Sequence, residues 1–329
     1  MADPADARSG GEAEKQAGER FTGEHFAAAL EAALAELRRC CAEVNALNVF
    51  PVADHDTGSN LCATLAAAVE AVRAAGSSDL GETAAAAARG AFLGARGSSG
   101  AILAEYLYGL SEAWRGVVEA DAARVAAALR IAANSARSAV QEPVEGTVLT
   151  VAAAAAAGAE AHGDRLPEVL VRAAATARLS WLRTPQMLPV LRRAGVVDAG
   201  AAGLVALLEA MAGTVRGTVP PPLSPPAPLA RIPARAAPSL PATARYCTEV
   251  LVRMRDMPVT RVRRTLQRLG DAVVVAERDG LVRIHLHTSA PHLVLARVLR
   301  WGSVEEVRAT RLPQEPSGDG EACPGEPEL

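Results

Sequence analysis

The chain has 329 residues, which is enough for two ordinary domains with a sizeable core. Half of the residues are hydrophobic but only 3% are aromatic, and the abundance of alanine indicates closely packed helices. The net charge of −3 offers no basic field for nucleic acid, and no long run of strongly apolar residues predicts a membrane span.

Changes in composition divide the chain into five segments. Residues 1–20 are polar, lack an apolar signal segment and are expected to be a disordered tail. Helical periodicity runs through 21–215, and the proline-rich residues 216–244 are expected to form a semi-rigid linker. Residues 245–312 change to the β-branched and alternating runs of a small α+β domain. Residues 313–329, rich in proline, glycine and glutamate, are expected to be a second disordered tail.

The first domain is predicted to contain eight helices, because its apolar periodicity is interrupted by regularly placed breakers. They are expected to begin near residues 24, 57, 80, 98, 120, 146, 166 and 199. A short extra turn, Pro185–Arg193, is expected before the last helix. Since no strand pattern intervenes, the predicted fold is an eight-helix up-and-down barrel or bundle, followed after the linker by the smaller α+β domain.

Four loops of small residues precede the even-numbered helices. In an up-and-down array these helix N-termini lie at the same end of the molecule, so unpaired N–H groups and positive dipole ends would converge on one rim. This arrangement predicts an anion-binding site, with phosphate as the candidate ligand. The loops are VADHDTGSN, GARGSSG (94–100), EPVEGT (142–147) and VVDAGAAG (196–203).

Asp54 and Asp56 in the first loop supply the hard oxygen ligands that magnesium prefers, usually together with phosphate oxygens and water. Taken alone, the pair is explained more simply as a helix cap and an Asx turn. The three other loops at the same rim favour the metal site, and we predict both aspartates as metal ligands.

The remaining loops allow the same two interpretations. Backbone N–H groups and serine hydroxyls between glycines can wrap a phosphate, but they can equally cap helices. Gly146 would serve the backbone conformation, and Arg96 would pair with phosphate or face solvent. The candidates are Arg96, Gly97, Ser98, Ser99, Gly100, Glu145, Gly146, Thr147, Asp198, Gly200 and Gly203.

Several phosphate chemistries are excluded by the residues present. Walker A loops and Schiff-base catalysis need a lysine in the folded part, and Lys15 is the sole lysine. The first domain has no Rossmann strand–loop–helix, and no G-x-S-x-G elbow follows a strand. Metal and phosphate without a P-loop leave phosphoryl transfer by positioning and charge neutralisation.

In the second domain YCTEVLVRM, AVVVAER and LVRIHLHT are predicted strands. Two helices, VTRVRRTLQRLG and PHLVLARVLRWG, are predicted to end at Gly270 and Gly302. His285 and His287 are two apart on one strand, so they share a face, and with Cys247 they form a three-ligand set for zinc. The sequence alone favours a small buried cysteine and half-exposed histidines.

The five cysteines follow no regular spacing. Without a secretory signal, reduced thiols in a cytoplasmic protein fit this pattern better than disulfides. Cys40, Cys41 and Cys62 are expected to pack between helices rather than bind metal.

Five motifs in order resemble the fatty-acid kinase A branch of the dihydroxyacetone-kinase L-subunit family, over residues 21–312. The resemblance implies an eight-helix barrel that binds ATP or ADP with two Mg²⁺ ions, and a middle domain that binds metal, here Zn²⁺, and forms a homodimer. A fatty acid held by a partner protein would receive the γ-phosphoryl group on its carboxylate. The motifs are LNVFPVADHDTGSNL, GARGSSGAIL, PVEGTVLTV, RTPQMLPVLRRAGVVDAGAAGL and YCTEVLV…VRIHLHTSAP.

The resemblance also assigns roles to individual residues. Asp54 and Asp56 would bind magnesium, Asn48 would stand near a further ligand position, and the serine loop would contact the phosphates. The whole predicted nucleotide-binding set is Asn48, Thr57, Gly58, Ser59, Asn60, Arg96, Gly97, Ser98, Ser99, Gly100, Thr147, Asp198, Ala199 and Gly200.

Three features depart from the family pattern. His55 stands where glycine is usual, and if the position needs a positive φ, histidine tolerates it better than most residues. It would add a metal ligand or crowd the site. Ser98 replaces the usual asparagine, and the family's long C-terminal, partner-recruiting domain is expected to be absent.

The motifs and the resemblance leave three hypotheses for the function of this protein. The leading hypothesis is an ATP- and magnesium-dependent kinase component that acts on a fatty-acid carboxylate. The second is a glycerone (dihydroxyacetone) kinase-type subunit, which needs a separate substrate-binding subunit. The third is a non-catalytic nucleotide sensor, which His55 and the missing C-terminal domain favour.

Overall fold

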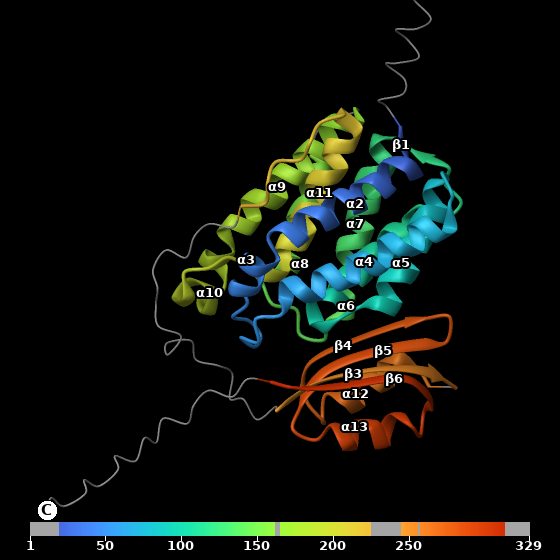
Figure 1. Ribbon diagram of the computed structural model, residues 1–329, viewed down its shortest axis with the longest axis vertical. Helices are drawn as coiled ribbons and strands as arrows, with labels where there is room; N and C mark the ends of the chain where they lie inside the picture. The colour runs from blue at the N-terminus through green and yellow to red at the C-terminus, as the bar shows by residue number, and fades with distance from the viewer. Residues whose placement is uncertain (1–19, 162–164, 225–244, 256, 313–329) are drawn as a thin grey trace, which may run out of the picture.

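The computed structural model describes residues 20–161, 165–224, 245–255 and 257–312. Apart from Arg20, both predicted tails lie outside these residues, as does most of the predicted proline-rich linker. Figure 1 shows a helical domain placed end-on against one face of a small sheet domain. The helices of the first domain are α2 (Gly23–Arg39), α3 (Cys41–Ala46), α4 (Thr57–Ala75), α5 (Leu80–Gly94), α6 (Gly97–Ala113), α7 (Ala122–Ala139), α8 (Val148–Glu160), α9 (Leu166–Met187), α10 (Pro189–Ala194) and α11 (Ala199–Arg216).

The eight predicted helices are confirmed, and each begins within two residues of its predicted start. Three features were not predicted. α3 is an additional short helix, and the two-residue strands β1 (Phe21–Thr22) and β2 (Glu119–Ala120) pair with each other. Their shortness explains why no periodicity marks them.

The predicted extra turn Pro185–Arg193 is wrong in its boundaries, because Pro185 lies inside α9 and the short helix is α10. Proline has no N–H for the carbonyl four residues earlier, which belongs to Trp181. The Thr184 hydroxyl donates to that carbonyl at 2.7 Å instead, so the helix continues without an unpaired acceptor.

α11 forms the centre of the helical domain and is buried along its whole length from Ala201 to Gly213. Among the described residues it is the one helix long and apolar enough to cross a membrane, but 78% of it is covered by the rest of the domain. A helix that is apolar on all sides and surrounded by other helices is a core helix, and the alanine-rich neighbours pack closely around it.

The second domain is an antiparallel sheet in the order β4–β5–β3–β6. α12 and α13 lie on the sheet face turned away from the helical domain (Figure 1). The hydrophobic core of the second domain contains the side chains of β3, β4 and β5 that point toward α12 and α13. The elements are β3 (Tyr246–Met254), α12 (Val259–Leu266), β4 (Asp271–Arg278), β5 (Leu281–Thr288), α13 (Pro291–Val298) and β6 (Gly302–Arg311).

The three predicted strands are confirmed, but the fourth, β6, was missed. β6 lies at the sheet edge and is mostly exposed, so it lacks the alternation of a half-buried strand. The predicted helix ends at Gly270 and Gly302 are also wrong, because α12 and α13 stop earlier and neither glycine has a positive φ. A Cβ at Gly270 or Gly302 would lie 2.1 Å or 1.9 Å from a strand carbonyl oxygen, so close backbone approach requires them.

Arginine side chains of the sheet domain donate hydrogen bonds to carbonyl groups at helix ends of the first domain. The buried Arg283 guanidinium donates to the carbonyls of Leu93 and Ala95 at the end of α5. Arg263 donates to the Ser138 carbonyl near the end of α7 at 2.8 Å. Cations at helix C-termini are favourable, and these contacts hold one sheet face against the rim where α4 and α6 begin.

Candidate functional site

A polar pocket lies between the first two loops of the rim and the facing sheet. It combines the loop before α4, the N-terminus of α6 and side chains from β3 and β5. The two predicted sites, one for magnesium and one for zinc, therefore open into the same pocket. Its lining residues are Asn48, Phe50, Pro51, Val52, Asp54, Asp56, Thr57, Asn60, Gly97, Ser98, Ser99, Cys247, His285 and His287.

The carboxylates of Asp54 and Asp56 face this pocket. Asp56 occupies the N-cap position of α4, yet its side chain makes no capping hydrogen bond. The simpler interpretation of Asp56 as a helix cap is therefore wrong. Asp54 accepts a hydrogen bond from the Asn48 amide. Burial, with the neighbouring Asp56 carboxylate, raises the pKa of Asp54 to about 6. Two acids held together in this way are a natural site for a divalent cation.

His55 has a φ of 56°, so the position does need the left-handed conformation that favours glycine. Its ring Nδ1 lies 3.2 Å from the carbonyl oxygen of Asn45 in α3. The side chain is exposed and does not line the pocket. In this structure His55 therefore neither joins Asp54 and Asp56 as a ligand nor crowds them.

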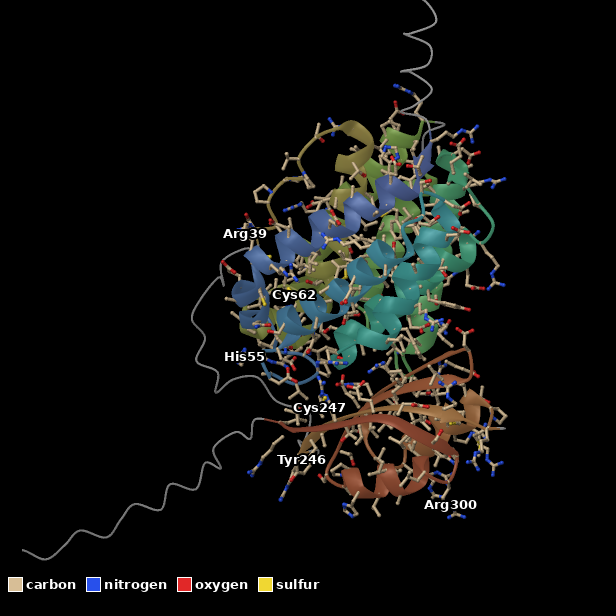
Figure 2. All side chains as sticks on the ribbon, turned by 45° about the vertical axis from the view of Figure 1, so that its right-hand side comes forward. Arg39, His55, Cys62, Tyr246, Cys247 and Arg300 are labelled. Atoms are coloured by element: carbon tan, nitrogen blue, oxygen red, sulfur yellow. The ribbon has the colours of Figure 1, made fainter. Side chains whose placement is uncertain are left out.

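Cys247, His285 and His287 form a compact cluster on the sheet and line the pocket together with residues of the helical rim. Figure 2 shows Cys247 at the side of the sheet domain nearest the helices. Cys247 lies directly across from His287 in the β3–β5 register. One ligand atom from each residue lies within 4.8 Å of the others. Both histidines are buried, so the expectation of half-exposed rings is wrong. The buried Nε2 of His285 has no hydrogen-bond partner among the described residues, which suits a metal ligand.

Burial is the main influence on both imidazoles. Together with the neighbouring His285, it lowers the pKa of His287 to about 3. Burial opposes protonation of His285 as well, but Cys247 and Glu249 outweigh it and raise the pKa of His285 to about 10. A divalent cation would replace the proton as the positive charge in this cluster.

Glu249 is a site residue that the sequence did not reveal. It lies opposite His285 in the sheet, and its carboxylate accepts a hydrogen bond from the backbone N–H of Gly97 at 2.6 Å. Glu249 shares one face of β3 with Cys247 and Leu251. A charged residue is unusual on a strand face that other elements cover, and this signal could have identified it.

Several predicted nucleotide-binding residues hold the rim together instead of lining the pocket. Gly58 and Gly100 allow α4 to approach α3 and α6, Ser59 bonds to Asn45, and Arg96 pairs with Glu306. Gly146 has a φ of 84°, as expected for a backbone role, and the Thr147 hydroxyl caps α8. Ala199 is buried in the first turn of α11.

Asp198 is a buried N-cap of α11, and its carboxylate accepts the N–H of Ala201 at 2.8 Å. Its own N–H donates to the Thr184 hydroxyl, and its carbonyl accepts the indole N–H of Trp181. Burial raises the pKa of Asp198 to about 6 despite the backbone N–H groups that favour its ionised form. The backbone of Asp198 therefore joins the last rim loop to α9, while its carboxylate caps α11.

Asp198→Asn is expected to change the pH dependence of stability. An acid whose pKa rises from 3.8 to about 6 on folding loses stability as pH increases between these values. Asparagine does not ionise, so the variant should gain about 2 kcal/mol relative to the parent between pH 4 and pH 7. Urea unfolding at several pH values measures this difference, and parallel stability curves would contradict the buried acid.

A second, apolar pocket adjoins the first at Ser99 and extends between α6, α7, α8 and α11. Val148, the first residue of α8, and Gly200, from the fourth rim loop, line it. The Tyr106 hydroxyl is buried there without a hydrogen-bond partner among the described residues. The lining residues are Ser99, Ile102, Leu103, Tyr106, Ala136, Val148, Ala152, Gly200 and Leu204.

Comparison with known proteins covers both domains. The DAK2 domain model matches residues 51–213, and the model of the FakA-like fatty acid kinase middle domain matches residues 243–317. The chain is 32% identical to Protein YloV of Bacillus subtilis over 308 residues, which is 89% of this chain and 56% of that protein. Uncharacterized proteins of Staphylococcus saprophyticus and Staphylococcus haemolyticus are 29% and 30% identical, over 83% of this chain and 52% of each relative. The chain thus spans about half the length of these relatives.

Proposed function

Because the chain belongs to the family that joins a DAK2 domain to a FakA-like fatty acid kinase middle domain, we propose that it is an ATP- and magnesium-dependent phosphotransferase component. The proposed acceptor is a fatty-acid carboxylate presented by a partner protein in the cytoplasm. The observation that carries this proposal is the single pocket in which Asp54 and Asp56 face the N-terminus of α6. A homodimer remains a prediction.

The donor set of the pocket fits magnesium bound to a nucleotide. Asp54 and Asp56 would hold the metal, which when bound neutralises phosphate charge during transfer. Ser98 and Ser99, in the first turn of α6, would offer backbone N–H groups and hydroxyls to the phosphates. The apolar pocket beside Ser99 would take the nucleoside base.

The Cys247, His285 and His287 cluster fits zinc by ligand type, mutual distance and the orphaned His285 nitrogen. Three protein ligands leave a fourth position open, which is the arrangement of zinc sites that take part in chemistry. When bound, zinc would supply a Lewis acid at the sheet side of the pocket. Such a site would lie in the same pocket as Asp54 and Asp56, which supports an acceptor carboxylate approaching the γ-phosphate from the sheet side.

The match to the DAK2 domain supports a second candidate, a glycerone kinase-type subunit with a separate substrate subunit. The sensor hypothesis loses one of its two reasons, because the His55 ring is turned away from Asp54 and Asp56. A pull-down from the source organism separates the two kinases by the partner recovered. A fatty-acid-binding protein supports the first, and a dihydroxyacetone-binding subunit supports the second.

Mg²⁺–ATP is expected to bind the purified chain and raise its melting temperature. A ligand that binds only the folded state at 100 times its Kd contributes about 2.7 kcal/mol to stability. Isothermal titration calorimetry with ATP, in magnesium and in EDTA, measures the affinity and its metal dependence. Binding of equal strength in EDTA, or none in magnesium, would overturn the proposed site.

A further inference from the structure

Glu249 connects the two halves of the pocket. On the helical side its carboxylate accepts the Gly97 N–H at 2.6 Å, and in its own sheet it lies 3.9 Å from His285 Nδ1. Its side chain is only 10% exposed, so both contacts are largely shielded from water. One carboxylate therefore touches the loop proposed to bind phosphate and a residue proposed to bind zinc.

The contact with Gly97 places a negative charge where a phosphate would seek the positive end of α6. Gly97 has a φ of 62°, and a Cβ there would lie 2.3 Å from the Asn60 side-chain nitrogen. Only glycine therefore fits at this position. In a shielded pocket like charges repel more strongly than in water, so the Glu249 carboxylate disfavours an incoming phosphate.

The negatively charged Glu249 carboxylate also lies near the His285 ring, which is its second partner. Histidines that bind metal commonly give their other ring N–H to a carboxylate, which orients the ring. The β3–β5 register sets Glu249 directly across from His285 and Cys247 across from His287. A divalent cation on this cluster would offset the charge of Glu249 and hold its carboxylate on the sheet side.

We propose that Glu249 is a positioning residue that couples metal occupancy of the Cys247–His285–His287 cluster to nucleotide affinity at the N-terminus of α6. The inference rests on the proposed function above and specifies how that site is regulated. Metal on the cluster strengthens Mg²⁺–ATP binding, and by thermodynamic linkage Mg²⁺–ATP strengthens metal binding by the same factor.

The test measures Mg²⁺–ATP affinity by calorimetry on the full chain, metal-free at the cluster and with one equivalent of zinc. The wild type is expected to bind Mg²⁺–ATP about tenfold more tightly with zinc. Glu249→Gln keeps an acceptor oxygen for Gly97 but loses the charge. The zinc effect should then fall to about twofold, mainly because the metal-free variant binds ATP more tightly.

Glu249→Ala removes the same charge by a second substitution, and melting curves of both Glu249 variants show whether the fold is intact. A changed ATP affinity in a folded variant then reflects the missing charge. Glu306→Gln is the matched control, since Glu306 lies in the same interface against Arg96 and Arg283 but is not a partner of Gly97 or His285. It should retain the tenfold zinc effect. Zinc titration against a competing chelator, with and without Mg²⁺–ATP, gives the reciprocal coupling.

A tenfold zinc effect that survives in both Glu249 variants overturns the inference. Equal gains in ATP affinity with and without zinc also overturn it, because Glu249 then only competes with phosphate. If the wild type binds zinc and Mg²⁺–ATP independently, the coupling fails while the proposed nucleotide site stands. If the wild type binds no Mg²⁺–ATP, the proposed function fails first.

Discussion

Asp54→Asn with Asp56→Asn is expected to abolish magnesium-dependent ATP binding and any phosphoryl transfer, without unfolding the chain. The two carboxylates are the proposed magnesium ligands, and asparagine preserves their size while removing both charges. Without anionic ligands the affinity for Mg²⁺–ATP should fall below detection by calorimetry. Circular dichroism should show unchanged helicity.

The same variant should be more stable than the wild type in metal-free buffer at pH 7.5. The pKa of Asp54 is raised on folding from 3.8 to about 6, mainly by burial, so its ionised form opposes folding above that pH. Removing the charges relieves this cost, and the melting temperature should rise. A loss of Mg²⁺–ATP binding with a gain of stability is typical of residues that serve a functional site. If the two aspartates only stabilised the fold, their replacement would lower the stability as well as the binding.

Asp79→Asn is the matched control for this experiment. Asp79 is the N-cap of α5 and accepts the Glu82 N–H at 3.0 Å. The substitution makes the same chemical change at a helix start that does not line the pocket. It should leave Mg²⁺–ATP affinity within about twofold of the wild type and change stability only slightly. Unaltered binding in the Asp54/Asp56 variant would remove the magnesium assignment.

Cys247→Ala with His285→Ala is expected to eliminate zinc from the protein. The wild type should carry about one zinc per chain by elemental analysis after purification without chelator, and the variant close to none. Two of three ligands are removed, and a lone histidine cannot retain the ion against buffer. Loss of zinc should also lower the melting temperature, because metal binding stabilises the folded state.

Cys62→Ala with His292→Ala removes the same two residue types outside the cluster. Cys62 packs against the helical core, and His292 is exposed at the start of α13. This control should keep its zinc. A wild-type chain that is folded and metal-free after incubation with zinc would return Cys247, His285 and His287 to a purely structural role.

The elements that could be predicted from sequence are those with local signals. The loop before α4 contains Asp54, Asp56 and His55 at a positive φ, and the helix begins at Thr57 as the apolar periodicity and the breakers predict. Alternating and β-branched residues likewise located β3 and β5. The edge strand β6 was missed because it buries almost nothing.

The site residues divide in the same way. Residue type and spacing made the Asp54–Asp56 pair and the set of Cys247, His285 and His287 candidates, although the sequence alone favoured a structural role for the second set. Their position in one pocket could not be derived, because it depends on how two separately predicted domains pack. Glu249 was missed for the same reason: its partner Gly97 lies 152 residues away in the chain.

The sequence by itself therefore determined the order of the elements and the two domains, and it predicted two candidate ligand sets. These properties come from backbone preferences and periodicities that act over a few residues. The tertiary structure decided which rim residues line a pocket, which ones cap helices, and that Cys247, His285 and His287 line the same pocket as the aspartates. Those outcomes depend on contacts between Arg283, Arg263 or Glu249 and a helix end of opposite partial charge. Such long-range contacts exist only after the chain has folded.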